Sequence, residues 1–181
     1  YAALTYLLDR SSIGANGLVA LPYFQGERTP FEDPYAKGVL FGLTLKHSRA
    51  DVYRALLESV GFGIRHNVEV LHSEGIHPKR ILGIGGATKN KAWMQMICDI
   101  ANVNMLIPRQ QIGASYGDAM MAGVGAGVYE GLEAIGQWID YAEELSPDLE
   151  KFKKYSALYE IYRELYEQTK HLMAKIGKAV D

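Results

Sequence analysis

The sequence has little cysteine and no long hydrophobic run, and each shortage excludes a class of protein. Its single cysteine, Cys98, excludes an internal disulfide and a zinc knuckle and fits a reducing cytoplasm. The longest apolar stretch, at 119–129, is interrupted by glycines and is shorter than the roughly 20 residues that a membrane-spanning helix needs. The five histidines have no metal-site spacing. We therefore expect a cytoplasmic protein with no membrane partner and no metal-binding motif of its own.

Neither sign of charge dominates the chain. The 19 basic and 21 acidic side chains among 181 residues give a net charge of −2, which offers no electrostatic basis for binding nucleic acid. A hydrophobic content of 48% and a charged content of 22% are typical of a globular protein and exclude a disordered one. A domain of this length can bury about 70% of the surface of its unfolded chain. One globular domain is therefore the simplest expectation.

Hydrophobic patterning predicts strands and helices that alternate along the middle of the chain. We expect short strands at 18–22, 38–44, 81–84 and 105–108. We expect helices from the Ser48 cap to the stop at Gly75, at 91–101, and beginning near Ala114. From residue 81 onward the order is strand, helix, strand, helix, and this order at this spacing is typical of parallel pairing in an α/β layer.

Two features indicate that further structure lies upstream. The strands are few for a complete sheet, and the first ten residues read as a helix already under way. We therefore expect this chain to be a piece of a longer protein, with the first strands of its sheet missing.

The end of the chain, at 148–176, carries an apolar stripe that predicts one long helix. The stripe steps by threes and fours through Phe152, Tyr155, Tyr159, Tyr162, Tyr166, Thr169, Met173 and Ile176. A coiled-coil seam would more usually carry leucine and isoleucine. The favoured interpretation is a helix that lies across its own domain, and the alternative is a docking face.

The most informative local segment joins a predicted strand to a predicted helix through glycines. Gly85, Gly86 and Ala87 let the backbone approach a ligand closely, and the N–H groups at the start of a helix attract phosphate. Asn90 follows within one turn, where its amide could reach a ribose or a base. The alternative is a tight strand-to-helix turn with Asn90 as its cap, and the residues alone leave both interpretations open.

This glycine segment matches neither of the two common nucleotide fingerprints. A dinucleotide pattern can be started at Gly83, but Thr88 stands where its last glycine or alanine belongs. The run of a P-loop is absent from the sequence. Any phosphate site here therefore belongs to another class.

Small residues recur at every fourth position in the helix expected near Ala114. Gly113, Gly117, Met121 and Gly125 share one face, which predicts tight packing against a sheet or another helix. Only the start of this helix, from Gly113 to Ser115, is a candidate for contact with a ligand.

Candidate side chains for acid-base chemistry are scattered. We expect Glu27 and Arg28 to form a buried acid-base pair that holds sugar hydroxyls or, as the favoured alternative, locks its loop. Asp33, Asp51, Asp99 and Asp118 are candidate general bases, although each also fits a turn, a cap or a helix surface. No catalytic triad is readable.

Taken in order, these segments resemble the C-terminal domain of the FGGY family of carbohydrate kinases over essentially the whole chain. Leu-Pro-Tyr-Phe-Gln-Gly-Glu-Arg-Thr-Pro at 21–30 is most similar to the xylulokinase branch. Gly-Val-Leu-Phe-Gly-Leu-Thr at 38–44, followed by His47, Arg-Ala-Asp at 49–51 and Arg-Ala-Leu-Leu-Glu at 54–58, resembles the signature segment of the family. Several motifs in the right order are far more specific than any one of them.

The resemblance implies an α/β fold, namely one ribonuclease-H-like half of an actin-like ATPase, with a long C-terminal helix. Residues 1–181 would be the C-terminal nucleotide-binding domain, with the active site in the cleft towards an N-terminal sugar-binding domain. The general-base aspartate and most sugar contacts of the family lie in that other domain. We therefore expect no catalytic residue and no metal ligand in this chain, and no kinase activity from it alone.

The resemblance also implies a substrate and particular contacts. ATP with Mg²⁺ would phosphorylate a sugar, D-xylulose or a close ketose, and a homodimer is a candidate assembly. The nucleotide-binding residues would be Gly85, Gly86, Ala87 and Asn90, with Gly113 and Ser115 near the adenine pocket. Ser115 departs from the alanine that is more usual in the family. The alternatives are an NAD-binding oxidoreductase domain and a non-catalytic module that docks through its tyrosine-rich helix.

Overall fold

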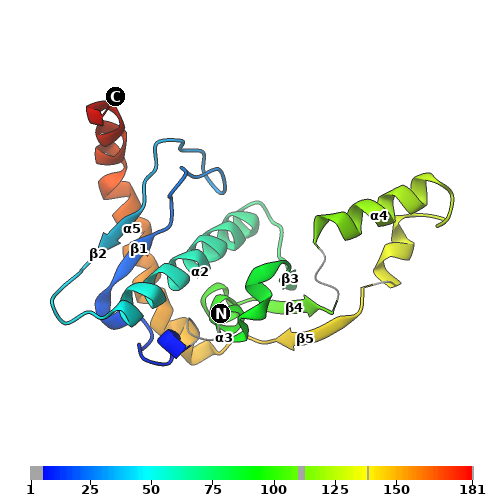
Figure 1. Cartoon of the computed structure of the whole chain (residues 1–181), viewed down its shortest axis with the longest axis horizontal. Helices are drawn as coiled ribbons and strands as arrows, with labels where there is room; N and C mark the ends of the chain where they lie inside the picture. The colour runs from blue at the N-terminus through cyan, green and yellow to red at the C-terminus, as the bar shows by residue number, and fades with distance from the viewer. Residues whose placement is uncertain (1–5, 110–112, 138, 181) are drawn as a thin grey trace.

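Two small sheets lie at different ends of a framework of long helices (Figure 1). The structure is a computed structural model that describes residues 6–109, 113–137 and 139–180. Its elements are η1 (Ala15–Gly17), β1 (Val19–Leu21), β2 (Val39–Phe41), α2 (Arg49–Ser73), β3 (Arg80–Leu82), η2 (Gly86–Lys89), α3 (Lys91–Ala101), β4 (Asn104–Pro108), α4 (Ala114–Gly125), η3 (Leu132–Gln137), β5 (Tyr141–Leu145) and α5 (Leu149–Val180). Of the expected opening helix, residues 6–8 are helical and residues 1–5 lie outside the described part.

The pairing of the strands confirms part of the expected α/β layer. β3 and β4 are parallel, with Ile81 opposite Met105, while β1 and β2 form a separate antiparallel pair. β5 adds to β4 in the antiparallel sense, with Leu106 opposite Glu144. The sequence did not predict β5, because its Tyr-Ala-Glu-Glu-Leu run holds residues that strands disfavour.

The two longest helices form the main core with β1. On α5 the buried side chains are Tyr155, Tyr159, Tyr162, Leu165 and Met173. They face Phe62 of α2, whose ring centre lies 5.4 Å from that of Tyr162, and Tyr23, whose hydroxyl lies 2.7 Å from the Tyr162 hydroxyl. The predicted stripe therefore packs across its own domain as far as Met173, whereas Ile176 is exposed.

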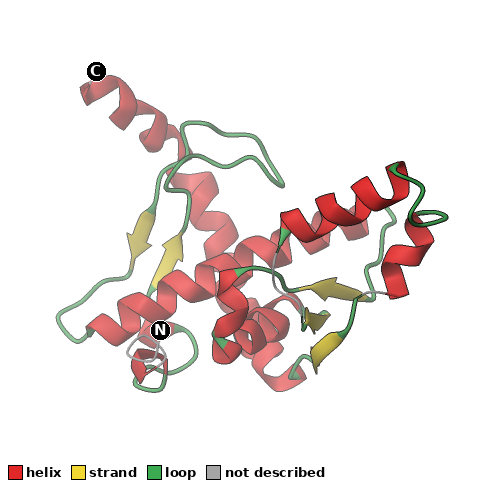
Figure 2. Cartoon of the chain, turned by 45° about the vertical axis from the view of Figure 1, so that its right-hand side comes forward, coloured by secondary structure: helices red, strands yellow, loops and turns green. Residues whose placement is uncertain are grey.

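The expectation that the helix near Ala114, α4, packs tightly through its small residues is wrong for the described residues. Its small-residue face does not pack tightly within the described residues, because no described atom lies within 4 Å of a Cβ built on Gly117 or Gly125, and Met121 is 56% exposed. α4 packs against η3, and the two extend away from the body of the molecule (Figures 1 and 2). Small residues at helical spacing permit a close approach, but they do not themselves supply the partner.

A left-handed turn precedes β1 and is held by side chains from α2. Ala15 and Asn16 have φ angles of 47° and 55°, in a region that costs energy for residues other than glycine. The carboxylate of Asp51 accepts hydrogen bonds from the Asn16 amide at 2.7 Å and the Ser11 hydroxyl at 2.6 Å. Glu58, about two turns further along α2, accepts from the Gly14 N–H at 3.0 Å. The two α2 carboxylates therefore fix this turn.

Replacing Asp51 with alanine should lower the free energy of unfolding by about 3 kcal/mol, because the buried carboxylate also caps α2 through the Ser48 N–H at 2.7 Å. Its hydrogen bonds, from Ser11 first, hold the pKa of Asp51 well below its ordinary value of 3.8. The stability that it contributes is therefore present above that value and lost as the pH falls below it. Urea unfolding at two pH values measures the effect, with the exposed Glu32→Ala as control. Equal stability of Asp51→Ala and wild type would contradict the expectation.

Replacing Glu58 with glutamine should change how stability depends on pH. Burial raises the pKa of Glu58 to about 7, against partial opposition from the Gly14 N–H, Arg54 and the Tyr155 hydroxyl. The folded state therefore favours the protonated form, and its contribution to stability is lost as the pH rises from 4.5 towards 7. Urea unfolding should show Glu58→Gln gaining up to about 3 kcal/mol relative to wild type between pH 5 and pH 8. A difference that is the same at both pH values would be the contrary result.

Candidate functional site

The glycine segment forms a turn that is open on one side. Gly85 has φ +83°, and no described atom lies within 4 Å of a Cβ built on it. The short 3₁₀ helix η2 follows, and the Thr88 hydroxyl donates to the Gly85 carbonyl at 2.6 Å. This bond braces the turn from inside and leaves the Gly85 side open. The turn reaches α3 through η2, an intermediate step that the sequence did not predict.

Asn90 is the N-cap of α3 and is buried, with 5% of its surface exposed. Its side-chain oxygen accepts the Trp93 backbone N–H at 3.2 Å. The capping interpretation therefore holds for the oxygen atom. A contact with a nucleoside would be made by the amide nitrogen.

Gly113 and Ser115 stand at the start of α4, next to residues 110–112, which lie outside the described part. Gly113 has φ +76°, and it too has no described atom within 4 Å of a Cβ built on it. The turn at Gly85 follows β3, and Gly113 comes five residues after the end of β4. Because these neighbouring strands are parallel, their carboxyl ends lie at the same edge of the sheet. That edge is where open α/β sheets bind ligands.

The loop that carries Glu27 and Arg28 lies elsewhere, next to α5. The Glu27 carboxylate accepts from the N–H groups of Arg28 at 2.8 Å and Thr29 at 3.3 Å, so it locks its own loop. The expected buried pair is wrong, because the Arg28 side chain is exposed. The Tyr166 hydroxyl of α5 donates to Asp33 in the same loop at 2.8 Å. The structure does not gather this loop with the two glycine turns.

Three of the four candidate general bases serve structural roles. Asp33 and Asp51 accept the hydrogen bonds given above, and Asp99 accepts from the Asp148 N–H at 3.0 Å. Asp118 is exposed on α4. Across the described ranges, no group of three or more histidine, cysteine, aspartate or glutamate side chains could hold a metal ion.

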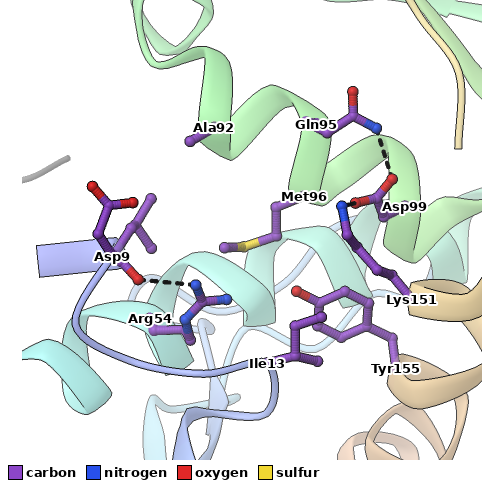
Figure 3. Close-up of a pocket in the computed structure, with 10 residues that line it drawn as sticks. Asp9, Ile13, Arg54, Ala92, Gln95, Met96, Asp99, Lys151 and Tyr155 are labelled. Atoms are coloured by element: carbon purple, nitrogen blue, oxygen red, sulfur yellow. Dashed lines mark hydrogen bonds and ion pairs between the residues drawn. The ribbon is translucent and has the colours of Figure 1, made fainter. Parts of the chain in front are cut away.

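A cavity of about 260 Å³ lies between the segment before β1 and the helices α2, α3 and α5 (Figure 3). Its polar side chains are largely paired with protein groups. Asp99 accepts from Gln95 at 2.7 Å and lies 3.3 Å from the Lys151 ammonium, while Arg54 donates to the Leu8 carbonyl at 3.0 Å. No motif in the sequence pointed to this cavity, because its walls come from four separate segments.

No helix in the described part of the chain is both long enough and apolar enough to cross a membrane.

Comparison with known sequences shows which family the chain belongs to. Residues 5–126 match the model of the FGGY family of carbohydrate kinases, C-terminal domain. The chain is 36% identical to the xylulose kinase of Bacillus subtilis over 161 residues, covering 88% of this chain and 32% of that protein. It is 35% identical to the xylulose kinase of Escherichia coli over 173 residues, covering 95% of this chain and 36% of that protein. The chain therefore spans about a third of the length of these relatives.

Solved structures give the same result. A ligand-bound xylulose kinase from Lactobacillus acidophilus superposes with a TM-score of 0.86 at 25% identity, covering 96% of this chain and 35% of that one. The xylulose kinase from Rhodospirillum rubrum superposes with a TM-score of 0.81 at 34% identity, covering 95% of this chain and 34% of that one. These neighbours are sugar kinases with the actin-like, ribonuclease-H-like fold. The chain belongs to the FGGY family of carbohydrate kinases and corresponds to its C-terminal domain.

Proposed function

We propose that residues 1–181 are the nucleotide-binding domain of an ATP-dependent sugar kinase, which transfers the γ-phosphoryl group of ATP to a hydroxyl of D-xylulose. The observation that carries the proposal is the pair of open glycine turns, at Gly85 and Gly113, beyond neighbouring parallel strands. The relatives described above support the choice of sugar, since they are xylulose kinases.

The proposed nucleotide contacts follow from the chemistry of the turns. The backbone at Gly85, Gly86 and Ala87 would meet the phosphates and ribose, because a glycine without a side chain lets phosphate oxygens approach backbone N–H groups. Asn90 would meet the nucleoside, and Gly113 and Ser115 would lie near the adenine. Magnesium bound to the phosphates would neutralise their charge. Through these contacts the residues of this chain would position the nucleotide.

We propose that the remaining machinery lies in an N-terminal domain, which would bind the sugar and supply the general-base aspartate. The open side of β3 supports the further proposal that strands from upstream complete this sheet. Within the described residues β3 pairs only with β4, and Leu82 of β3 and the nearby Ile84 are 49% and 61% exposed. Exposed apolar side chains beside an unpaired strand edge are typical of a surface that another segment covers.

We also propose that the protein is cytoplasmic and forms a homodimer. An apolar surface at β2 and α5, where Phe41, Leu43 and Ile161 are exposed, would suit a second copy of the chain.

The loop of Glu27 and Arg28 is proposed to face the substrate side, with Glu27 keeping the loop in shape. The relatives reported above are sugar kinases, which gives no support to the oxidoreductase or docking-module alternatives.

The proposed nucleotide site can be tested by calorimetric titration of the full-length protein with Mg·ADP. Asn90→Ala should weaken binding about tenfold, because it removes both the amide and the cap of α3. Asn90→Ser keeps a good capping group but lacks the amide nitrogen, so it should weaken binding nearly as much. Asp148→Ala is the matched control, because it removes the cap of α5 and should leave binding unchanged. Binding of NAD in place of ADP, or normal ADP binding by both Asn90 variants, would overturn the assignment.

The proposed division of labour predicts that the isolated 181-residue chain makes no sugar phosphate from ATP and D-xylulose, whereas the full-length protein does. The physical reason is that the general base and the opposite wall of the cleft are expected outside this chain. A coupled assay for ADP release measures both proteins, with circular dichroism to establish that the isolated chain is folded. Sugar-dependent turnover by the isolated chain would contradict the division. A full-length protein that phosphorylates another ketose but not D-xylulose would contradict the choice of sugar.

A further inference from the structure

Trp93 occupies an unusual place, in the first turn of α3 between two separate hydrophobic cores. Its ring packs against the core formed by α2, α5 and β1, and also against the core beneath the β3–β4–β5 sheet. The members of these cores that lie on α3 are Met96 and Ile100 for the first, and Met94, Ile97 and Cys98 for the second. A displacement of the indole would therefore disturb the packing on both sides of α3.

The polar atoms of Trp93 connect the glycine turn to α2. Its backbone N–H donates to the Asn90 side chain at 3.2 Å, at the end of the turn. Its indole Nε1–H donates to the carbonyl of Leu57, in the interior of α2, also at 3.2 Å. A single residue thus links the turn proposed to hold phosphate to the middle of the longest helix beside it.

α3 has a second close attachment to α2, at its other end. A Cβ built on Gly61 would lie 2.6 Å from the Cδ1 atom of Ile100, so only a glycine allows the two helices to approach this closely with Ile100 in place. Ile100 lies about two turns of helix beyond Trp93. α3 is therefore attached to α2 at two points, and the one at Trp93 lies next to the glycine turn.

We propose that Trp93 is a positioning residue for nucleotide binding, which sets the glycine turn relative to α2 through its indole hydrogen bond. This inference rests on the nucleotide site proposed above. Gly85 has open space beside it and Gly86 is exposed, so the turn is held from the protein side, by the Thr88 hydroxyl within it and by Trp93 at its end. Without the indole bond, the first turn of α3 can tilt and carry Asn90 and the glycine backbone with it.

The test uses the full-length protein with two replacements of Trp93. Trp93→Phe removes the N–H group and part of the ring, and benzothienylalanine keeps the shape of the indole but has sulfur in place of N–H. Both should raise the KM for ATP about three- to tenfold, the effect of one hydrogen bond, with the KM for the sugar changed less than about twofold. Ile100→Val is the matched control, because it removes one buried methyl group from the other attachment of α3. It should lower the Tm without changing the KM for ATP.

The outcomes separate the two proposals. If the wild type binds no Mg·ATP, the nucleotide site itself is wrong and the inference falls with it. If the wild type binds Mg·ATP but both Trp93 replacements lower only the Tm, with the KM for ATP unchanged, Trp93 is a core residue and the inference alone is overturned. A raised KM for ATP in the Ile100→Val control as large as that of the Trp93 replacements would also overturn it.

Discussion

The close crossing of α2 and α3 is the contact on which the rest of the structure depends. Gly61 permits this approach, because a Cβ at that position would lie 2.6 Å from the Cδ1 atom of Ile100, whose side chain would have to shift. α2 carries Asp51 and Glu58, which hold the left-handed turn before β1, while α3 carries the side chains that pack beneath the other sheet. The two sheets are not hydrogen-bonded to one another in the described residues, so their relative position is set by these helices.

Regular patterns made most of the fold predictable from the sequence. Hydrophobic patterning with the Ser48 cap predicted α2, and the tyrosine stripe predicted α5 together with the face that it buries. β5 could not be predicted, because its strand form comes from pairing with β4 and not from the preferences of Ala142, Glu143 and Glu144. The packing of α4 was mispredicted for a related reason. The spacing of its small residues shows which face of the helix another element could approach, but it does not show whether an element packs on that face.

At the candidate site, the sequence predicted the places of the turns better than the roles of their side chains. Glycines after apolar strands predicted where the backbone would be accessible to a ligand. Both Gly85 and Gly113 have open space where a side chain would lie. The engagement of the Asn90 oxygen and the exposure of Arg28 depend on the geometry around them, which residue types alone do not specify. Trp93 gave no signal in the sequence, because its contacts are with residues as distant as Leu57.

The extension formed by α4 and η3 has a consequence for local stability. A helix with few buried side chains, of which Met120 is the one in α4 within the described residues, can open at a much lower free energy than the cores around Phe62 and Cys98. The sheet edge near Gly85 and Gly113 is therefore followed by one helix that packs into both cores, α3, and one that is loosely packed, α4. Local opening of α4 would leave both cores and the left-handed turn in place.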